Sequence, residues 1–289
     1  MKNIVEYLLF RSFEKLFQLL GINLSRKFSL ILAALFYYLI PIRKTTVIEN
    51  LKIAFPDSKM NRIKSIAFGC YKSFAITLVE ILYIPQMNEA DIKNQLICEN
   101  LAFLRSKYEE NKGVILLSAH FGNWEYLVAS LGVQLNLPLS AISKEQRNPY
   151  VSKWMNKART KWTNNVVPLG ISIRRTYQTL LDKQIVIIVA DQRAAEKSIK
   201  VKFFGREVSV FVGPAVLALK TGAPIIYAIS VRQSDYYYKT VFTEISKENL
   251  PESQDEKIKE LSQRHMSYLE GYIRKYPEQW LWMHKRWKH

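Results

Sequence analysis

The sequence predicts an α/β protein: a single layered domain with a mostly parallel sheet flanked by helices, plus a helical extension at the N-terminus. The main observation is that short apolar runs alternate with helical stretches from about residue 113 onward, which favours a parallel sheet. The expected strands lie at 113–118, 139–142, 165–169, 185–190, 224–231 and 236–245. The expected helices between and after them lie at 123–135, 148–162, 172–183, 213–221 and 254–276.

The part of the chain before residue 113 is expected to be helical. Apolar residues recur at helical spacing through 47–54, 59–82 and 99–110. At the other end of the sheet, the run 236–245 alternates in polarity and predicts an antiparallel edge strand. No repeat, low-complexity tract or linker interrupts the sequence. We therefore expect one domain over 45–289, preceded by a separate segment over 1–44.

The first forty-four residues read as a membrane-associating segment. Apolar residues between positions 5 and 20 recur at helical spacing opposite Lys2, Arg11 and Lys15, which is typical of an interfacial amphipathic helix. The apolar run 28–42 then follows. It is shorter than the about 20 apolar residues that a membrane-spanning helix needs, so we expect membrane anchoring without predicting a span. No small-residue cleavage site follows, so a secretory signal is not expected. The alternative is a helical hairpin folded onto the domain.

The composition indicates an anionic partner and a reducing compartment. The chain has 42 Lys and Arg against 25 Asp and Glu, a formal net charge of +17. Nucleic acid, an anionic lipid surface and an acidic carrier protein are the three classes of partner that such a charge favours. Cys70 and Cys98 show no metal-binding or redox spacing and are expected to be core thiols.

His120 and Glu125 form the most informative pair in the chain. Five residues along a continuous helix or strand would point the two side chains in different directions, so the chain must turn between them. Gly122 supplies the turn, and Asn123 is a good N-cap for the helix that carries Glu125. The pattern predicts that Glu125 orients His120 as a general base. The alternative is a capped helix start with an ordinary loop histidine.

The segment Ser118-Ala-His120-Phe-Gly-Asn-Trp-Glu125 resembles the His-x4-Glu signature of the bacterial lipid A late acyltransferases, relatives of the glycerolipid acyltransferases. The ordered set of further matches makes the resemblance specific from about residue 47 to the end. These matches are Asn50-Leu51, Ala54-Phe55-Pro56, Asn148-Pro149, Arg159, Ala190-Asp191-Gln192, Phe203-Phe204-Gly205, Thr221-Gly-Ala-Pro224, Pro277-Glu-Gln-Trp-Leu-Trp282 and Lys285-Arg286-Trp287. The Phe-Pro-Glu-Gly-Thr-Arg block of the glycerolipid branch is missing, which favours the lipid A branch.

The resemblance implies acyl transfer from a thioester donor, expected to be acyl carrier protein, to a hydroxyl of a lipid A precursor or related glycolipid. It implies no metal and no cofactor. It places the enzyme at the cytoplasmic face of the inner membrane, where the acceptor lipid and an anionic surface are its partners. A multiply acylated lipid has negligible solubility as a monomer, because each buried methylene contributes about 0.8 kcal/mol.

Four further residues are candidates for substrate binding. Arg159 matches an important family arginine, and its planar guanidinium suits a phosphate or acyl carbonyl, although a solvated helix flank is the alternative. Asp191 ends the most apolar strand, where ligands of open α/β sheets bind, although it could simply satisfy loop amides. Gln192 adjoins this site by position, and Asn123 lies in the turn itself. The C-terminal tryptophans and cations fit either an interfacial belt or a tail packed on the core.

Other functions fit the sequence less well. A serine-type lipid hydrolase would share a His–acid pair, but Gly-x-Ser-x-Gly is missing and Ser118 precedes His120 on a presumed strand. A zinc hydrolase would need His-Glu-x-x-His or a cysteine cluster. A non-catalytic nucleic-acid binder would explain the isoelectric point of about 9.7, but the basic residues are dispersed and no nucleic-acid fold signature occurs. No nucleic acid is therefore expected as a partner.

Overall fold

A computed structural model describes residues 1–162, 164–169 and 172–288. The main sheet has seven strands in the order β1-β9-β8-β2-β5-β3-β4, and a separate hairpin pairs β6 with β7. The strands are β1 Leu96–Cys98, β2 Val114–Ser118, β3 Leu139–Ser143, β4 Asn164–Pro168, β5 Ile185–Val189, β6 Lys200–Phe203, β7 Arg206–Ser209, β8 Ile225–Arg232 and β9 Tyr238–Glu244.

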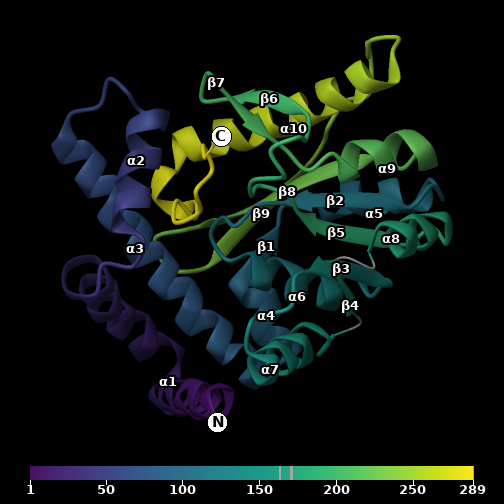
Figure 1. Cartoon of the computed structure of the whole chain (residues 1–289). Helices are drawn as coiled ribbons and strands as arrows, with labels where there is room; N and C mark the ends of the chain where they lie inside the picture. Colours follow the sequence, from purple (N-terminus) through teal and green to yellow (C-terminus); the bar gives the residue numbers. More distant parts are fainter. Residues whose placement is uncertain (163, 170–171, 289) are drawn as a thin grey trace.

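Ten α-helices lie within the described residues and surround the sheet (Figure 1). They are α1 Lys2–Ala34, α2 Lys44–Ala54, α3 Met60–Tyr83, α4 Glu89–Gln95, α5 Leu101–Glu109, α6 Trp124–Leu135, α7 Pro149–Arg159, α8 Ser172–Leu181, α9 Gly213–Thr221 and α10 Gln254–Lys275. The π-turn η1 Leu35–Leu39 extends α1, and the 3-10 turns η2 Ile84–Gln86 and η3 Pro277–Gln279 follow α3 and α10.

The predicted mostly parallel sheet is confirmed. Strands β8, β2, β5, β3 and β4 run parallel to one another, and β9 pairs antiparallel with β8. The antiparallel direction of 236–245 is therefore confirmed, but its edge position is wrong. The three-residue strand β1 pairs outside β9, and so short a strand leaves little periodic signal in the sequence.

Strand β2 lies between two hydrophobic cores, one on each face of the sheet. All five of its residues are buried. Ile115 and Leu117 face a core closed by α8, α9 and α10, whereas Val114 and Leu116 face a core closed by α4, α5, α6 and α7. Because alternate side chains of a strand point to opposite faces, a strand covered on both sides must be apolar throughout. This three-layer arrangement fixes β2 and its neighbours, which carry the candidate site.

The N-terminal segment packs on the domain and still presents a large apolar surface. Its two expected parts form one helix, broken at Gly21, whose φ of 73° only glycine adopts readily. Phe17 and Ala33 are buried, and α1 packs along α3. The opposite side exposes apolar side chains: Ile4, Val5, Leu8, Leu9, Phe13, Leu16, Leu19, Leu24, Phe28, Leu30 and Ile31.

Two helical stretches of the described residues are long and apolar enough to cross a bilayer. They run from Lys2 to Leu39 and from Met60 to Gln86. The second is mostly covered by the rest of the protein, as expected of a core helix, whereas the first is mostly uncovered. Length and composition alone are weak evidence for a span, and a core helix or a signal sequence meets the same criterion. The first stretch is nevertheless suited to contact with a membrane.

A buried ion pair ties α1 to the domain. Nε of Arg26 on α1 donates to Glu80 on α3 at 2.8 Å, and the two side chains are 4% and 0% exposed. The other oxygen of Glu80 accepts from Tyr238 of β9 at 2.6 Å and from Asn123 at 2.9 Å. Four separate segments of the chain therefore meet at one carboxylate.

Replacing Arg26 with methionine is expected to destabilise the protein by about 3–5 kcal/mol, because it leaves the buried Glu80 without its counter-charge. Urea unfolding in detergent, followed by tryptophan fluorescence, measures the difference. Lys27→Met on the same helix is the matched control, since Lys27 is exposed and its loss should change stability little. Equal stabilities for the two variants would contradict the role given to the pair.

Candidate active site

The chain turns sharply between the end of β2 and the start of α6, and Gly122 makes the turn possible. Its φ is +55°, and a Cβ at this position would lie 2.0 Å from the carbonyl oxygen of Ser230 on the neighbouring strand β8. Any side chain here would require the backbone to move. The turn predicted between His120 and Glu125 is therefore present, and the close approach of β8 explains why it needs glycine.

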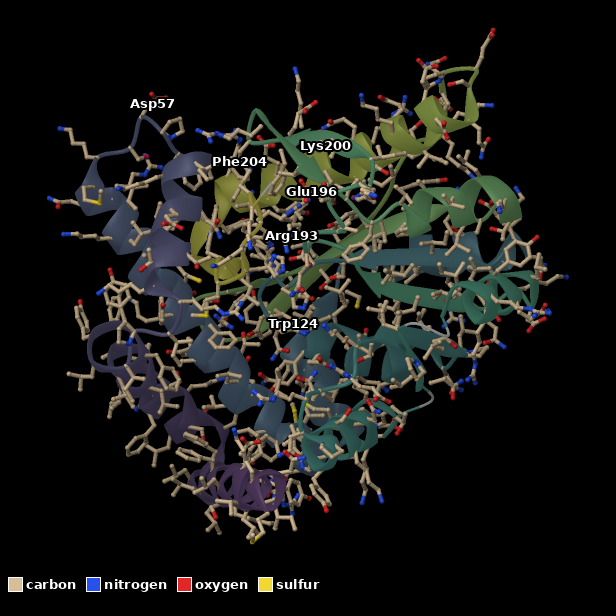
Figure 2. All side chains as sticks on the ribbon, in the orientation of Figure 1. Asp57, Trp124, Arg193, Glu196, Lys200 and Phe204 are labelled. Atoms are coloured by element: carbon tan, nitrogen blue, oxygen red, sulfur yellow. The ribbon has the colours of Figure 1, made fainter. Side chains whose placement is uncertain are left out.

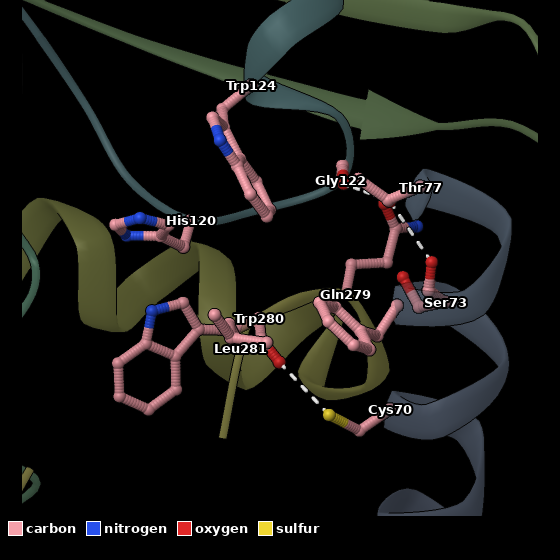
Figure 3. Close-up of a pocket in the computed structure, with 10 residues that line it drawn as sticks. Cys70, Ser73, Thr77, His120, Gly122, Trp124, Gln279, Trp280 and Leu281 are labelled. Atoms are coloured by element: carbon pink, nitrogen blue, oxygen red, sulfur yellow. Dashed lines mark hydrogen bonds between the residues drawn. The ribbon is translucent and has the colours of Figure 1, made fainter. Parts of the chain in front are cut away.

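Backbone and side-chain bonds clamp this turn on both sides. Thr77 of α3 donates its hydroxyl to the carbonyl of Gly122 at 2.7 Å, and the amide of Gly122 donates to the carbonyl of Gln279 at 2.9 Å. The amide of Leu281 donates to the carbonyl of His120 at 3.0 Å. Figure 3 shows these C-terminal residues and α3 on either side of the turn. The backbone that carries His120 is thus held independently of its side chain.

The side-chain oxygen and nitrogen of Asn123 both form hydrogen bonds within the protein. Its side-chain oxygen accepts from the amide of Tyr126 at 3.0 Å, as the N-cap prediction requires, and its side-chain nitrogen donates to Glu80. The residue is fully buried. The sequence predicts that Asn123 binds substrate; in the structure, both ends of its side-chain amide bond to groups of the protein.

His120 and Asp191 meet because their strands are neighbours in register. Ser118 at the end of β2 pairs with Val189 at the end of β5, so the residues two positions beyond each strand lie side by side. Nδ1 of His120 lies 2.8 Å from Oδ1 of Asp191, and the His120 amide donates to Oδ2 at 3.1 Å. The same Oδ2 accepts from the indole nitrogen of Trp280 at 2.8 Å.

This pairing sets the ionisation of both groups. Burial alone would lower the pKa of His120, but the charge and hydrogen bond of Asp191 outweigh burial and raise it above its ordinary value. Burial also acts to raise the pKa of Asp191, but His120 and the Trp280 indole keep it below its ordinary value. Asp191 is therefore an ionised carboxylate at Nδ1, and Nε2 is the nitrogen left for proton exchange.

Glu125 binds Arg159 rather than His120. Nε and Nη2 of Arg159 donate to the two carboxylate oxygens at 2.9 and 2.5 Å, and Nη1 donates to the hydroxyl of Ser143 at 2.6 Å. Because α6 begins immediately after the turn, Glu125 points along the sheet edge toward β3 and α7. The carboxylate expected at His120 Nδ1 is thus supplied by Asp191. Glu125 acts on His120 through its charge, which helps to raise the pKa of the imidazole.

The remaining predicted residues lie at the same sheet edge. Side-chain nitrogen Nε2 of Gln192 lies 3.5 Å from Nε2 of His120, at the outer limit of a hydrogen bond. Arg159 adds a positive charge that tends to lower the pKa of His120, after the larger effects of burial and the two carboxylates. His120, Glu125, Arg159, Asp191 and Gln192 therefore belong to one cluster.

A small, mainly apolar hollow opens beside His120 (Figure 3), with a volume of only about 10 Å³. The α3 side of it contributes Cys70 and Phe74, and the turn and C-terminal segment contribute Trp124 and Leu281. The ring of Trp124 also contacts the His120 imidazole edge-on, at 4.8 Å between centroids. Figure 2 places Trp124 near the centre of the molecule, away from the tip of the loop that carries Asp57.

The C-terminal segment completes the site. From the sequence, this segment could be either a membrane-interface belt or a tail packed on the core. Trp280 and Trp282 are 2% and 0% exposed, so the packed tail is the correct interpretation for them. Trp280 was not predicted as a site residue. The Pro277–Trp282 match marked the segment as significant, but only the fold shows that its indole reaches Asp191.

Other chemistries find little support within the described residues. Ser118 is buried in β2 and is not among the residues that line the hollow. Cys70 does line the hollow, but burial raises the pKa of its thiol to about 12, which disfavours the nucleophilic thiolate. In the described part of the chain, no group of three or more His, Cys, Asp and Glu residues is placed to hold a metal ion.

Histidine NMR titration should give His120 a pKa above 6.5, and Asp191→Asn should bring it below 6.5. The reason is that the carboxylate raises this pKa against burial, so burial prevails once the charge is removed. His120→Gln assigns the resonance among the four histidines. An unchanged His120 titration in the Asp191→Asn protein would show that the two side chains do not interact in solution.

Comparison with known proteins identifies the family. The family model for bacterial lipid A biosynthesis acyltransferases matches residues 4–289. The lipid A biosynthesis palmitoleoyltransferase of Escherichia coli is 24% identical over 249 residues, which cover 85% of this chain and 79% of the relative. The phosphatidylinositol mannoside acyltransferase of Mycolicibacterium smegmatis is 22% identical over 223 residues, covering 74% and 70%. The chain is an acyltransferase and belongs to the bacterial lipid A biosynthesis acyltransferase family.

Proposed function

We propose that the enzyme transfers a fatty acyl chain from a thioester, carried by acyl carrier protein, to a hydroxyl of a lipid A precursor or related glycolipid. The observation that carries this proposal is the His120–Asp191 pair, held at the carboxyl edge of the sheet beside an apolar hollow. A base that is fixed at one nitrogen and open at the other is what activation of a hydroxyl requires.

In the proposed reaction the acceptor hydroxyl attacks the carbonyl carbon of the thioester as Nε2 of His120 removes its proton. The tetrahedral intermediate collapses with cleavage of the carbon–sulfur bond. The protonated imidazole then returns the proton to the departing thiolate, so that an ester and a free thiol are the products. Asp191 stabilises the positive charge on the imidazole between the two transfers and holds its tautomer. No covalent acyl-enzyme is needed.

The hollow beside His120 is too small to enclose an acyl chain, but its apolar rim is suited to contact the first carbons next to the thioester. Its lining includes Phe74, Trp124 and Leu281, and apolar contact stabilises a chain by about 0.8 kcal/mol for each buried methylene. The neutral thiol of Cys70 adds to this apolar surface and is not a candidate acyl carrier. These properties support direct transfer between donor and acceptor.

We assign Glu125 and Arg159 to positioning and electrostatic support of the site. The carboxylate is 5% exposed and the guanidinium 14%, so each largely satisfies the other within the protein. Their bidentate contact fixes the first turn of α6 against α7. Through its charge Glu125 also favours the imidazolium that forms during proton transfer. Gln192, near Nε2 of His120, is placed to contact the acceptor or the reacting carbonyl.

The choice of substrates rests on charge and on the relatives. A net charge of +17 suits an acidic carrier protein and an anionic membrane surface. The relatives are named for lipid A and for phosphatidylinositol mannoside, both glycolipids, which supports a sugar-bearing lipid acceptor. The exposed apolar side of α1 supports attachment to a membrane, and we assign this attachment to the cytoplasmic face of the inner membrane.

For catalysis, His120→Ala and Asp191→Asn are each expected to lower kcat by ~10²–10⁴-fold while the proteins stay folded. The wild-type rate should fall as the pH drops through the raised pKa of His120, because the base must be neutral. In Asp191→Asn this acidic limb should move to lower pH, because burial lowers the pKa of the imidazole once the carboxylate charge is lost. Thioester consumption and lipid product are measured together across pH.

Two results would overturn this assignment. One is a folded His120→Ala enzyme with near-normal turnover. The other is thioester hydrolysis that proceeds at the full rate without acceptor lipid, which would favour the lipid hydrolase.

For membrane attachment, Leu9→Glu and Leu16→Glu are each expected to weaken binding to vesicles about tenfold or more, because a buried leucine contributes about 1.5–3 kcal/mol. Both side chains are at least half exposed on α1. Point variants are preferable to deletion, since deletion would also remove the partner of Glu80. Leu181→Glu, at an exposed leucine of α8, is the control. Loss of binding in the control alone would assign attachment to another face.

A further inference from the structure

A second cavity lies between α1 and α7, away from the hollow beside His120. Its volume is about 560 Å³, and it is open to solvent. The two helices pack against each other near the N-terminus of the chain (Figure 1). The proposed reaction makes no use of this cavity, although it is the larger of the two.

The floor of the cavity is a preorganised polar network. Glu14 of α1 is only 2% exposed and accepts hydrogen bonds from Trp154 at 3.1 Å and from Gln18 at 2.9 Å. Arg11 pairs with the other oxygen of Glu14 at 2.7 Å, and Gln86 of η2 donates to Gln18 at 3.1 Å. Burying a carboxylate is costly unless such partners are present, so this floor is a built feature rather than a loose surface.

The rim of the cavity is strongly basic. The lining includes Arg11 and Lys15 of α1, Lys157 of α7, and Lys161, which follows the end of α7. These four cations and the one carboxylate of the described lining give a net charge of +3. The ammonium of Lys161 donates to the carbonyls of Pro85 and Met87, which closes one wall. Burial lowers the pKa of Lys161, and the charge of Asp91 offsets only part of this effect.

The position of the cavity indicates where an anion would come from. Lys15 lies on α1 between the polar floor and the exposed apolar stripe that includes Leu8 and Leu19, about 20–40° from each around the helix. If that stripe rests among acyl chains, the cavity opens at the level of the lipid headgroups. Phosphate is the charged group that anionic lipids present there.

We propose that the cavity between α1 and α7 binds the phosphate group of an anionic membrane lipid. Lysine ammonium groups act as point charges toward phosphate, and the polar floor accommodates hydroxyls of the headgroup. The cavity reaches Pro85, and the hollow beside His120 reaches Thr77, on the same continuous helical stretch. Eight residues correspond to roughly 12 Å along the axis, at about 1.5 Å per residue. A lipid with a sugar headgroup is long enough to occupy both.

Vesicle binding tests this proposal with the full-length protein. The vesicles are phosphatidylcholine with and without phosphatidylglycerol, at matched ionic strength. Lys15→Gln and Lys157→Gln should each reduce the gain in affinity from phosphatidylglycerol about tenfold, as expected for a charge-assisted contact. Lys27→Gln on α1 and Lys153→Gln on α7 are matched controls, since both are exposed and neither is among the cavity residues. They should change affinity less than about twofold.

Two outcomes would contradict the proposed binding of a lipid phosphate in this cavity. Equal losses in the cavity and control variants would overturn the proposal in favour of diffuse attraction to the surface. Inorganic phosphate that abolishes the phosphatidylglycerol effect, when chloride at the same ionic strength does not, would make free phosphate the ligand and overturn the lipid assignment. The inference rests on the proposed contact of α1 with the membrane. Binding of the wild-type protein to pure phosphatidylcholine vesicles tests that contact separately. Catalysis by His120 is assayed in detergent and is independent of both.

Discussion

The carboxylate of Glu80 is the interaction on which the geometry of the site depends. It is fully buried, and a buried charge is tolerated only where partners surround it. Arg26 of α1 neutralises it, Tyr238 of β9 donates to it, and Asn123 connects it to the turn that carries His120. The helix with the exposed apolar surface and the catalytic turn are therefore joined through one group. A displacement of α1 would reach the turn through two hydrogen-bonded contacts.

The pairing of His120 with Asp191 follows from the parallel arrangement of β2 and β5. Parallel neighbours bring their carboxyl ends to the same edge, and their register places His120 opposite Asp191 although 71 positions separate them. Trp280 then returns from the end of the chain to donate to the same carboxylate. Three distant segments thus share one hydrogen-bonded unit. Each depends on the sheet for its position, so the fold and the site are determined together.

Much of this could be predicted from the sequence, for reasons that particular residues make clear. The strands at 113–118 and 185–190 are apolar throughout because both faces are covered, and the turn at Gly122 was required by the spacing of His120 and Glu125. The partner of His120 could not be found in this way. Glu125 is near in sequence, but the first turn of α6 directs it toward Arg159. The sequence predicts Asp191 as a substrate-binding residue at a strand end, and only the register of β2 and β5 shows that it pairs with His120. Strands β1, β6 and β7 have three or four residues and carry too little periodicity to be recognised.

The hollow beside His120 and the cavity between α1 and α7 differ in their chemistry. Of the described residues that line the hollow beside His120, only the imidazole carries a titrating charge within the neutral range, and Phe74, Trp124 and Leu281 are apolar. Four cations instead line the cavity between α1 and α7. Residues of α3 line the apolar hollow and residues of its extension η2 line the charged cavity, so this helical stretch sets the distance between the two. A substrate with a phosphate at one end and an acylated hydroxyl at the other can satisfy both environments at once, whereas a free fatty acid or a soluble sugar phosphate can satisfy only one.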